Sequence, residues 1–187
     1  MLRKDHLNQL SRPSIVLHWF IALTIIGLLI SGIYMEENHA YAVYPWHKSF
    51  GILILLFVVL RIFWRIYNGW PEPIGNHARI ERIGAKAIHY VLIIASLMMP
   101  LSGVLMSGFG GHGLQLFGLE LMASNPDPVN PTKVLPIHVA VARNAHQLHG
   151  ILGNVMIAAL ILHVLGACKH HFLDKDGTLK RILGRKV

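Results

Sequence analysis

Charged side chains are scarce in this chain of 187 residues. Only 14% of the residues are Asp, Glu, Lys or Arg, whereas a soluble domain carries about 25%. Apolar residues make up 53% of the sequence, and the mean hydropathy is +0.50. This composition argues against a water-soluble domain. The net charge of +8 therefore predicts membrane topology rather than nucleic-acid binding.

Cysteine is almost absent as well, since Cys168 is the only one in the sequence. A single thiol excludes an internal disulfide, and the lack of a C-x-x-C-H motif excludes covalent attachment of a c-type haem. Histidine, in contrast, is abundant, with 13 residues. An imidazole is costly inside a bilayer. Histidines within apolar segments are therefore candidate functional residues.

Long apolar runs are abundant, and four of them approach the ~20 residues that a membrane-spanning helix requires. We expect the spans at about residues 14–34, 47–67, 87–107 and 147–168. The connection at 108–146 is long and rich in Gly and Pro, and such loops are often functional. We find no repeat and no separate soluble segment. The sequence therefore predicts one domain over residues 1–187, an all-α four-helix bundle embedded in the membrane.

The distribution of Lys and Arg predicts how the bundle is oriented. Cations gather at both termini and after the second span: Arg3, Lys4, Arg12, Arg65, Arg79, Arg82, Lys86, Lys169, Lys175, Lys180, Arg181, Arg185 and Lys186. The opposite side carries only Lys48, Lys133 and Arg143. Cytoplasmic segments are enriched in Lys and Arg, so we expect both termini in the cytoplasm.

Four histidines lie at matching depths in the expected spans. His149 and His163 are fourteen residues apart in the last span, which places them on nearly the same helix face and about 21 Å apart along the axis. His18 opens the first span at the inner side, and His47 opens the second span at the outer side. Depth therefore pairs His18 with His163 and His47 with His149.

A pair of histidines suits the two axial positions of a low-spin haem iron. Zinc normally takes four ligands, and no Cys, Asp or Glu lies at these depths to complete such a site. An iron with both axial positions filled does not readily bind oxygen, so electron transfer fits better than oxygenase chemistry. The sequence thus predicts two haems bound non-covalently inside the bundle.

Three other residues lie on the same helix faces. Gly51 and Gly153 each follow a histidine by four residues, where a flat ring would press against the helix backbone. The alternative is ordinary packing between membrane helices. Arg61 lies fourteen residues after His47 and thus near the inner haem level. We expect it to bind a haem propionate, with snorkelling at the membrane boundary as the alternative.

The remaining histidines have weaker claims. His146 competes with His149 as the outer ligand, but it lies about 100° away from the face that the span-four pair shares, so we favour His149. His89 is expected to bind a propionate, to serve a quinone site or to be simply interfacial. His170 and His171 are expected to face headgroups or water, with proton delivery to a quinone as the alternative. We assign no ligand role to His6, His39, His77, His112 and His138.

Several short motifs occur along the chain in order. They are IVLHW at 15–19, HKSFG at 47–51, PLSG at 100–103 and KDGTL at 175–179, with Arg61, His89, His149, Gly153, His163, His170 and His171 between them. In this combination and spacing they resemble the bacterial cytochrome b561 family. The resemblance extends from about Arg12 over nearly the whole chain.

The resemblance implies four membrane helices and two haem b groups, with His18 and His163 on one iron and His47 and His149 on the other. It also implies the bacterial inner membrane and electron exchange with ubiquinone or another quinone. One branch of the family is similar to a superoxide oxidase. We therefore expect an oxidoreductase that carries electrons from superoxide or a redox protein at the outer face to quinone.

Two other function classes compete with this interpretation. The first is a relay subunit of a partner dehydrogenase or hydrogenase, docked through the outer loop. The second is a haem sensor or a structural protein. Two haems at a trans-membrane spacing make this the least favoured of the three function classes. Superoxide is an anion, so Lys48 beside His47 is a candidate for steering it. Contact of Lys48 with headgroups or a propionate is the alternative.

Overall fold

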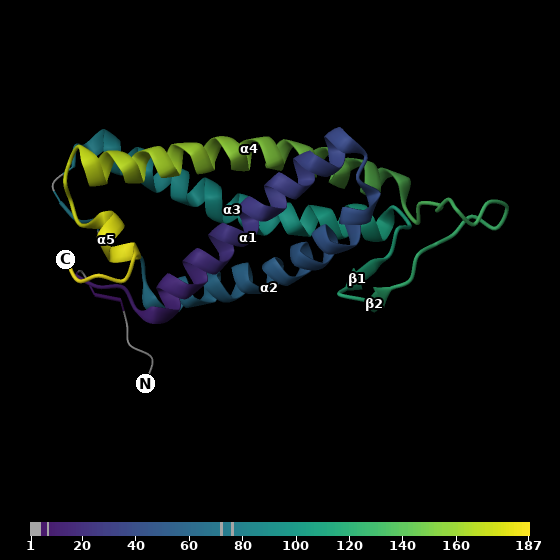
Figure 1. Ribbon diagram of the computed structural model, residues 1–187, viewed down its shortest axis with the longest axis horizontal. Helices are drawn as coiled ribbons and strands as arrows, with labels where there is room; N and C mark the ends of the chain where they lie inside the picture. The colour runs from purple at the N-terminus through teal and green to yellow at the C-terminus, as the bar shows by residue number, and fades with distance from the viewer. Residues whose placement is uncertain (1–4, 7, 72, 76) are drawn as a thin grey trace.

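The computed structural model describes residues 5–6, 8–71, 73–75 and 77–187 (Figure 1). Four long helices lie side by side as a bundle: α1 (Arg12–Asn38), α2 (Tyr44–Asn68), α3 (Arg79–Phe109) and α4 (Val139–Phe172). Each is long and apolar enough to cross a membrane. The prediction of an all-α four-helix membrane bundle is confirmed.

Prolines stand at the starts of two of the long helices and inside a third. Proline stands in the first turn of both α1 and α2, where its missing N–H costs nothing. Pro100 lies inside α3 instead, so the carbonyl of Ser96 loses its usual helical donor. Ser96 and Pro100 both line a cavity between the four long helices.

Each expected span lies within a longer helix, and the largest differences are at the starts of α3 and α4, which both begin eight residues before the expected spans. Helix α4 begins at Val139 rather than near Gln147, and His138 caps its N-terminus by accepting a hydrogen bond from the Val141 N–H. The added turns contain Arg143, Asn144 and His146 among small apolar residues, so a search for long, uninterrupted apolar segments misses them. The outer connection is correspondingly shorter than 108–146, and His146 lies inside α4.

The bundle is apolar on its outside as well as its inside. Ile21, Ile54 and Val58 form a small buried core, while many large aliphatic side chains face outward, including Val16, Leu23 and Ile30, each 63% exposed. In water such a surface would be an aggregation hazard. It is the surface that a lipid environment requires.

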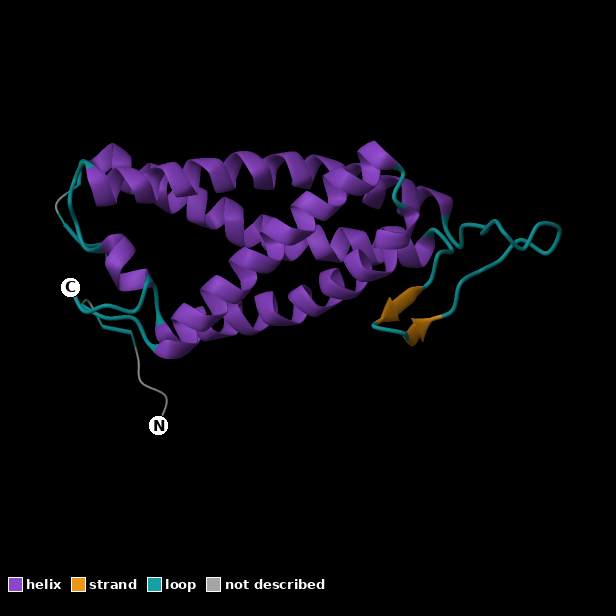
Figure 2. Ribbon diagram, in the orientation of Figure 1, coloured by secondary structure: helices purple, strands orange, loops and turns teal. Residues whose placement is uncertain are grey.

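One end of the bundle carries a β-hairpin that sequence patterns did not reveal. Strands β1 (Leu114–Leu116) and β2 (Leu119–Met122) pair antiparallel (Figure 2). The two turn residues between them, Phe117 and Gly118, both have positive φ, at 50° and 90°. That is the signature of the tight turn that matches strand twist. At the same end, the short 3-10 helix η1 (Tyr41–Val43) joins α1 to α2.

The opposite end carries both termini and the short helix α5 (Thr178–Ile182) (Figure 1). The Trp19 indole N–H donates to the carbonyl of Ile182 at 3.0 Å, which fastens α5 to α1. Asp5 pairs with Arg65 at 2.7 Å. Burial raises the pKa of this carboxyl, but hydrogen bonds from Ser11, Arg65 and Ser14 outweigh burial and lower the pKa to about 2.

The cations that predicted the orientation mostly lie at this end, in the short segments outside the helices or in the adjoining helix turns. Arg3 and Lys4 belong to the same set, but they lie outside the described residues.

Candidate functional site

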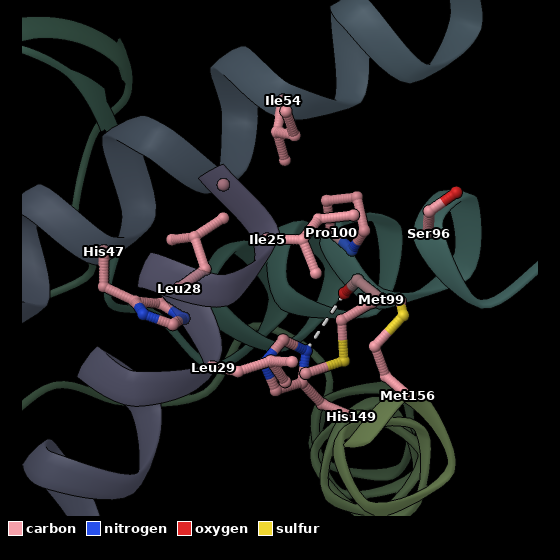
Figure 3. A pocket seen from close by; sticks show the side chains of 11 residues that line it. Ile25, Leu28, Leu29, His47, Ile54, Ser96, Met99, Pro100, His149 and Met156 are labelled. Atoms are coloured by element: carbon pink, nitrogen blue, oxygen red, sulfur yellow. Dashed lines mark hydrogen bonds between the residues drawn. The ribbon is translucent and has the colours of Figure 1, made fainter. Parts of the chain in front are cut away.

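His47 from α2 and His149 from α4 face each other across the bundle near the end that carries the hairpin. Their ring centroids are 6.4 Å apart, and the ring planes are inclined by 73°. Figure 3 shows both rings at one side of a cavity between α1, α2, α3 and α4. The two residues are separated by about 100 positions in the sequence, and only the packing of the helices brings them together.

Hydrogen bonds fix which nitrogen of each ring is free. Nδ1 of His149 lies 3.0 Å from the carbonyl of Met99 and 3.0 Å from Oγ of Ser102. A carbonyl accepts only, so Nδ1 of His149 carries the proton. Nδ1 of His47 lies 2.9 Å from Oγ of Ser31, whose own hydroxyl donates to Leu28. In both rings Nε2 is therefore left with its lone pair, as metal-binding histidines require.

His18 from α1 and His163 from α4 form a second pair nearer the other end. Their ring centroids are 6.3 Å apart and the planes are inclined by 63°. His89 of α3 stands beside His163 with its centroid 5.1 Å away, and its Nδ1–H donates to the carbonyl of Ala85. The depth pairing expected from the sequence thus corresponds to two facing pairs in the structure.

The separation of the rings is informative about what fits between them. A metal ion bound by two imidazole nitrogens at about 2 Å each, on the line between the rings, sets the ring centroids a little over ~6 Å apart. Both pairs have this spacing. Rings in direct hydrogen-bonded or stacked contact would lie closer. The residues present therefore fit a metal ion with two axial histidines at each level.

Arg61 of α2 lies at the level of the second pair, as its position in the sequence predicts. Its guanidinium is 3.2 Å from Nδ1 of His18. A guanidinium only donates hydrogen bonds, so this contact places the proton of His18 on Nε2. An Nε2 that binds a metal needs the other arrangement. Arg61 therefore suits a different acceptor, such as a carboxylate in the space beside it.

A cavity with an empty volume of about 410 Å³ lies between the outer histidine pair and the centre of the bundle. Its lining is almost entirely apolar and includes Gly51, Ile54, Met99 and Met156. A Cβ on Gly51 would meet no atom within 4 Å, so this glycine faces open space. Gly153 differs, because its Cβ would touch the Met99 side chain at 3.5 Å. Gly51 therefore has room for a bulky ligand beside it, whereas Gly153 packs against the side chain of Met99.

Two further glycines contact the outer histidines and were not singled out by spacing. A Cβ on Gly103 would lie 3.2 Å from Cε1 of His149, and one on Gly32 would lie 3.6 Å from Cε1 of His47. Gly103 belongs to the PLSG motif, which was the available signal. A second cavity of about 420 Å³ lies between α2 and α3 and is lined by Arg61, Arg65 and Trp70 among others.

Apart from His89, the other histidines that the structure describes have no ring contact with the two pairs. His146 contacts the sulfur of Met106 on α3 at 3.2 Å and is exposed, so it does not join the outer pair. His77 and His170 lie with Asp174 and Asp176 in a cluster at the end of the bundle that carries the termini. Within the described ranges, groups of three or more side chains that could hold a metal ion occur only here, with Glu81 as a further member. Each of the two facing pairs offers two histidines.

Comparison with known proteins identifies relatives along nearly the full length. Residues 9–185 match the model of the family described as prokaryotic cytochrome b561. The chain is 31% identical to cytochrome b561 homolog 2 of Escherichia coli K12 over 180 residues, which cover 92% of this chain and 89% of the relative. It is 25% identical to cytochrome b561 homolog 1 of the same strain over 185 residues, covering 96% and 99%. It is 24% identical to the probable superoxide oxidase CybB of Yersinia pestis over 174 residues, covering 91% and 93%.

Proposed function

Because the chain belongs to the prokaryotic cytochrome b561 family and is thus a membrane cytochrome with b-type haem, we propose that it holds two haems and passes electrons through them. The electrons would run between a donor at the outer face and the membrane quinone pool. The observation that carries this proposal is the presence of two facing histidine pairs, with ring centroids 6.3 and 6.4 Å apart, at two depths of one bundle. We further propose that residues 1–187 form a single domain.

Haem supplies a one-electron couple whose potential depends on its ligands and surroundings. The protein would hold the haems through His47 and His149 at one level and through His18 and His163 at the other. With two histidines for each iron, the sites would favour electron transfer over oxygen binding. Ser31, Met99 and Ser102 keep the outer imidazoles in one tautomer, and partners of this kind orient a ligating ring.

Arg61 is proposed to bind a propionate of the inner haem. Its guanidinium lies at the depth of His18 and lines the cavity between α2 and α3. The haem carboxylate would accept from the guanidinium in a bidentate geometry. It would also release Nδ1 of His18 from a contact that disfavours metal binding. Gly51 is proposed to leave room for the outer macrocycle.

Superoxide is the proposed small donor, since a relative is named a probable superoxide oxidase. Lys48 directly follows ligand candidate His47. Burial first, and the charge of Lys48 second, lower the pKa of His112 in the segment between α3 and β1. The charge of Lys48 therefore acts on this outer segment. A cation at the outer entrance would speed the capture of an anion.

A relay subunit is the second candidate, and one feature favours it. The segment between β2 and α4 extends beyond the end of the bundle (Figure 1), and Val129 on it is 93% exposed. A projecting loop of this kind suits the docking of a redox protein. In that case the donor would be a partner dehydrogenase or hydrogenase rather than superoxide.

The experiment that separates these candidates is stopped-flow spectroscopy of the purified haem-loaded protein in detergent. Superoxide is mixed with the protein, and the haem absorption is followed with and without added ubiquinone. Rapid haem reduction by superoxide and reoxidation by quinone supports a self-contained superoxide:quinone oxidoreductase. Haems that superoxide does not reduce, but that quinone reoxidises after chemical reduction with dithionite, indicate a relay that needs a partner. Haems inert to both reagents contradict the proposal.

We also propose the topology that the charges indicate, with the multi-pass chain in the inner membrane and both termini in the cytoplasm. The end of the bundle that carries the termini is rich in Lys and Arg, and the end that carries the hairpin has few. This orientation follows the positive-inside rule. A reporter enzyme that is active only in the cytoplasm, fused to Val187, tests this topology. We expect the fused reporter to be active, and an inactive reporter would indicate the opposite orientation.

A further inference from the structure

The β1–β2 hairpin folds back along the end of α2 instead of extending past it (Figure 1). Its turn is fastened to Ser49, since the Phe117 N–H donates to Oγ of Ser49 at 3.0 Å. The same hydroxyl lies 3.3 Å from the carbonyl of Gln115. Ser49 is five residues into α2, which begins at Tyr44, and thus about 7 to 8 Å along the helix axis. The hairpin turn therefore lies at a depth that belongs to the span.

Large apolar side chains of the hairpin are exposed at this depth. Phe117 is 49% exposed, Leu119 63% and Leu121 51%. Phe117 packs on Phe50 and Trp46 of α2, with ring centroids 5.2 and 6.1 Å away. These α2 residues are themselves 40% and 61% exposed. The hairpin thus continues the apolar outer surface of the bundle.

We propose that the Phe117–Leu121 edge of the hairpin inserts into the headgroup region of the bilayer and acts as a membrane anchor beside α2. Interfacial elements bury apolar side chains about 5 to 10 Å deep at the boundary between headgroups and acyl chains, and the hairpin turn lies beside Ser49, within the helix that is apolar enough to span the membrane. Aromatic residues such as Trp46 are enriched at the same level in membrane proteins.

The backbone of the hairpin sets the limit of this insertion. A two-stranded hairpin has unpaired N–H and C=O groups along both outer edges, and hydrocarbon does not satisfy them. Glu120 lies on β2 between Leu119 and Leu121 and is exposed, and a carboxylate also stays near water. The hairpin therefore belongs in the headgroup layer and does not enter the acyl core.

The segment after β2 provides an internal comparison. It leaves the bundle in the direction of the helix axes and lies beyond the helix ends (Figure 2). Val129 on this segment is apolar and 93% exposed, and it lies about midway in sequence between the end of β2 and the start of α4. A valine there should meet water, while Leu121 should meet lipid.

Cysteine labelling tests this proposal in the haem-loaded protein. Cys168 is replaced by serine, and Leu121→Cys and Val129→Cys are made separately in that background, with Leu119→Cys as a second hairpin variant. Each protein is placed at one copy per lipid nanodisc and treated with a water-soluble, membrane-impermeant maleimide. An unchanged haem spectrum shows that each variant folds, and equal labelling in SDS shows that each thiol is reactive.

The expected result is labelling of the hairpin cysteines about tenfold or more slower than labelling at position 129. Because a single copy per nanodisc leaves no protein neighbour, slow labelling identifies lipid as the cover. Equally fast labelling at positions 119, 121 and 129 would overturn the proposal. Labelling that is fast in nanodiscs but slow in densely reconstituted vesicles would also overturn it, and would indicate a second copy of the chain instead.

Discussion

The guanidinium of Arg61 lies 3.2 Å from Nδ1 of His18, although neither residue is near the other in sequence. Because a guanidinium only donates hydrogen bonds, Nδ1 of His18 accepts from it and Nε2 carries the proton. A protonated Nε2 cannot bind a metal. An anion between or beside the two groups resolves the conflict. A haem propionate is such an anion.

Replacing Arg61 by leucine should lower the reduction potential of the inner haem. Loss of one positive charge disfavours the added electron, and the shift should be on the order of tens of millivolts at an effective dielectric constant of about 20. Potentiometric titration of the haem spectrum measures it. Arg61→Lys keeps the charge and should shift the potential less. Movement of the outer haem's potential instead would contradict the placement of Arg61.

Replacing His163 by alanine should remove the inner haem and leave the outer one. The haem-to-protein ratio measured on the purified variant should therefore fall from two to one. His89→Ala is the matched control, because its ring stands 5.1 Å from His163 but its Nδ1–H is committed to Ala85. That variant should keep both haems. An unchanged ratio in His163→Ala would show that His163 is not a ligand.

Replacing Ser31 by alanine should weaken binding of the outer haem. Ser31 holds Nδ1 of His47 at 2.9 Å, and loss of such a partner typically costs about 10- to 100-fold in metal affinity. Transfer of haem to an excess of apomyoglobin measures the change. Ser107→Ala is the control, because that hydroxyl donates to the carbonyl of Gly113 and Ser107 lines neither cavity. Equal haem loss from both variants would rule out a specific role for Ser31.

Replacing Lys48 by glutamine should slow haem reduction by superoxide and weaken its dependence on salt. Electrostatic attraction accelerates the capture of an anion, and added salt screens it. Stopped-flow rates at low and high ionic strength provide the test. Lys133→Gln, on the exposed loop, controls for a general change in charge. A rate and salt dependence equal to those of the wild type would exclude steering by Lys48.

Replacing Asp5 by asparagine should lower thermal stability near neutral pH. The folded-state pKa of Asp5 is lowered to about 2, below the ~3.9 of a free aspartate. The charged carboxylate therefore stabilises the fold above pH ~4, and this contribution is lost as the pH falls toward 2. Unfolding temperatures of wild type and variant should differ at pH 7 and converge near pH 2.

Glu36→Gln serves as the control for Asp5, since Glu36 is exposed near the other end of the bundle. It should leave the unfolding temperature unchanged at both pH values. A destabilisation by Asp5→Asn that persists undiminished at pH 2 would mean that the ion pair with Arg65 is not its cause.

Much of the bundle could be predicted because its determinants are local. Hydropathy locates the spans, and helical periodicity places His149 and His163 on one face. Depth alone then selects His18 and His47 as their counterparts. Arg61 follows from the same periodicity, because fourteen residues separate it from His47. Each of these inferences uses only distances along one helix.

The residues that periodicity missed depend on how the helices are rotated against one another. Ser31 meets His47 and Gly103 meets His149 across helix interfaces, which no single-helix pattern reveals. The hairpin was missed for another reason. Its strands have three and four residues, and its turn is Phe-Gly rather than the Asn-Gly or Asp-Gly that usually signals a hairpin.

The central claim is that the bundle holds two haems, each between two histidines. The most direct test is to determine haem and protein concentrations together on the purified wild-type chain and to record the electron paramagnetic resonance spectrum of the oxidised protein. We predict two haems per chain and only low-spin ferric signals. One haem per chain, or a high-spin signal from an iron with an open position, would contradict the account.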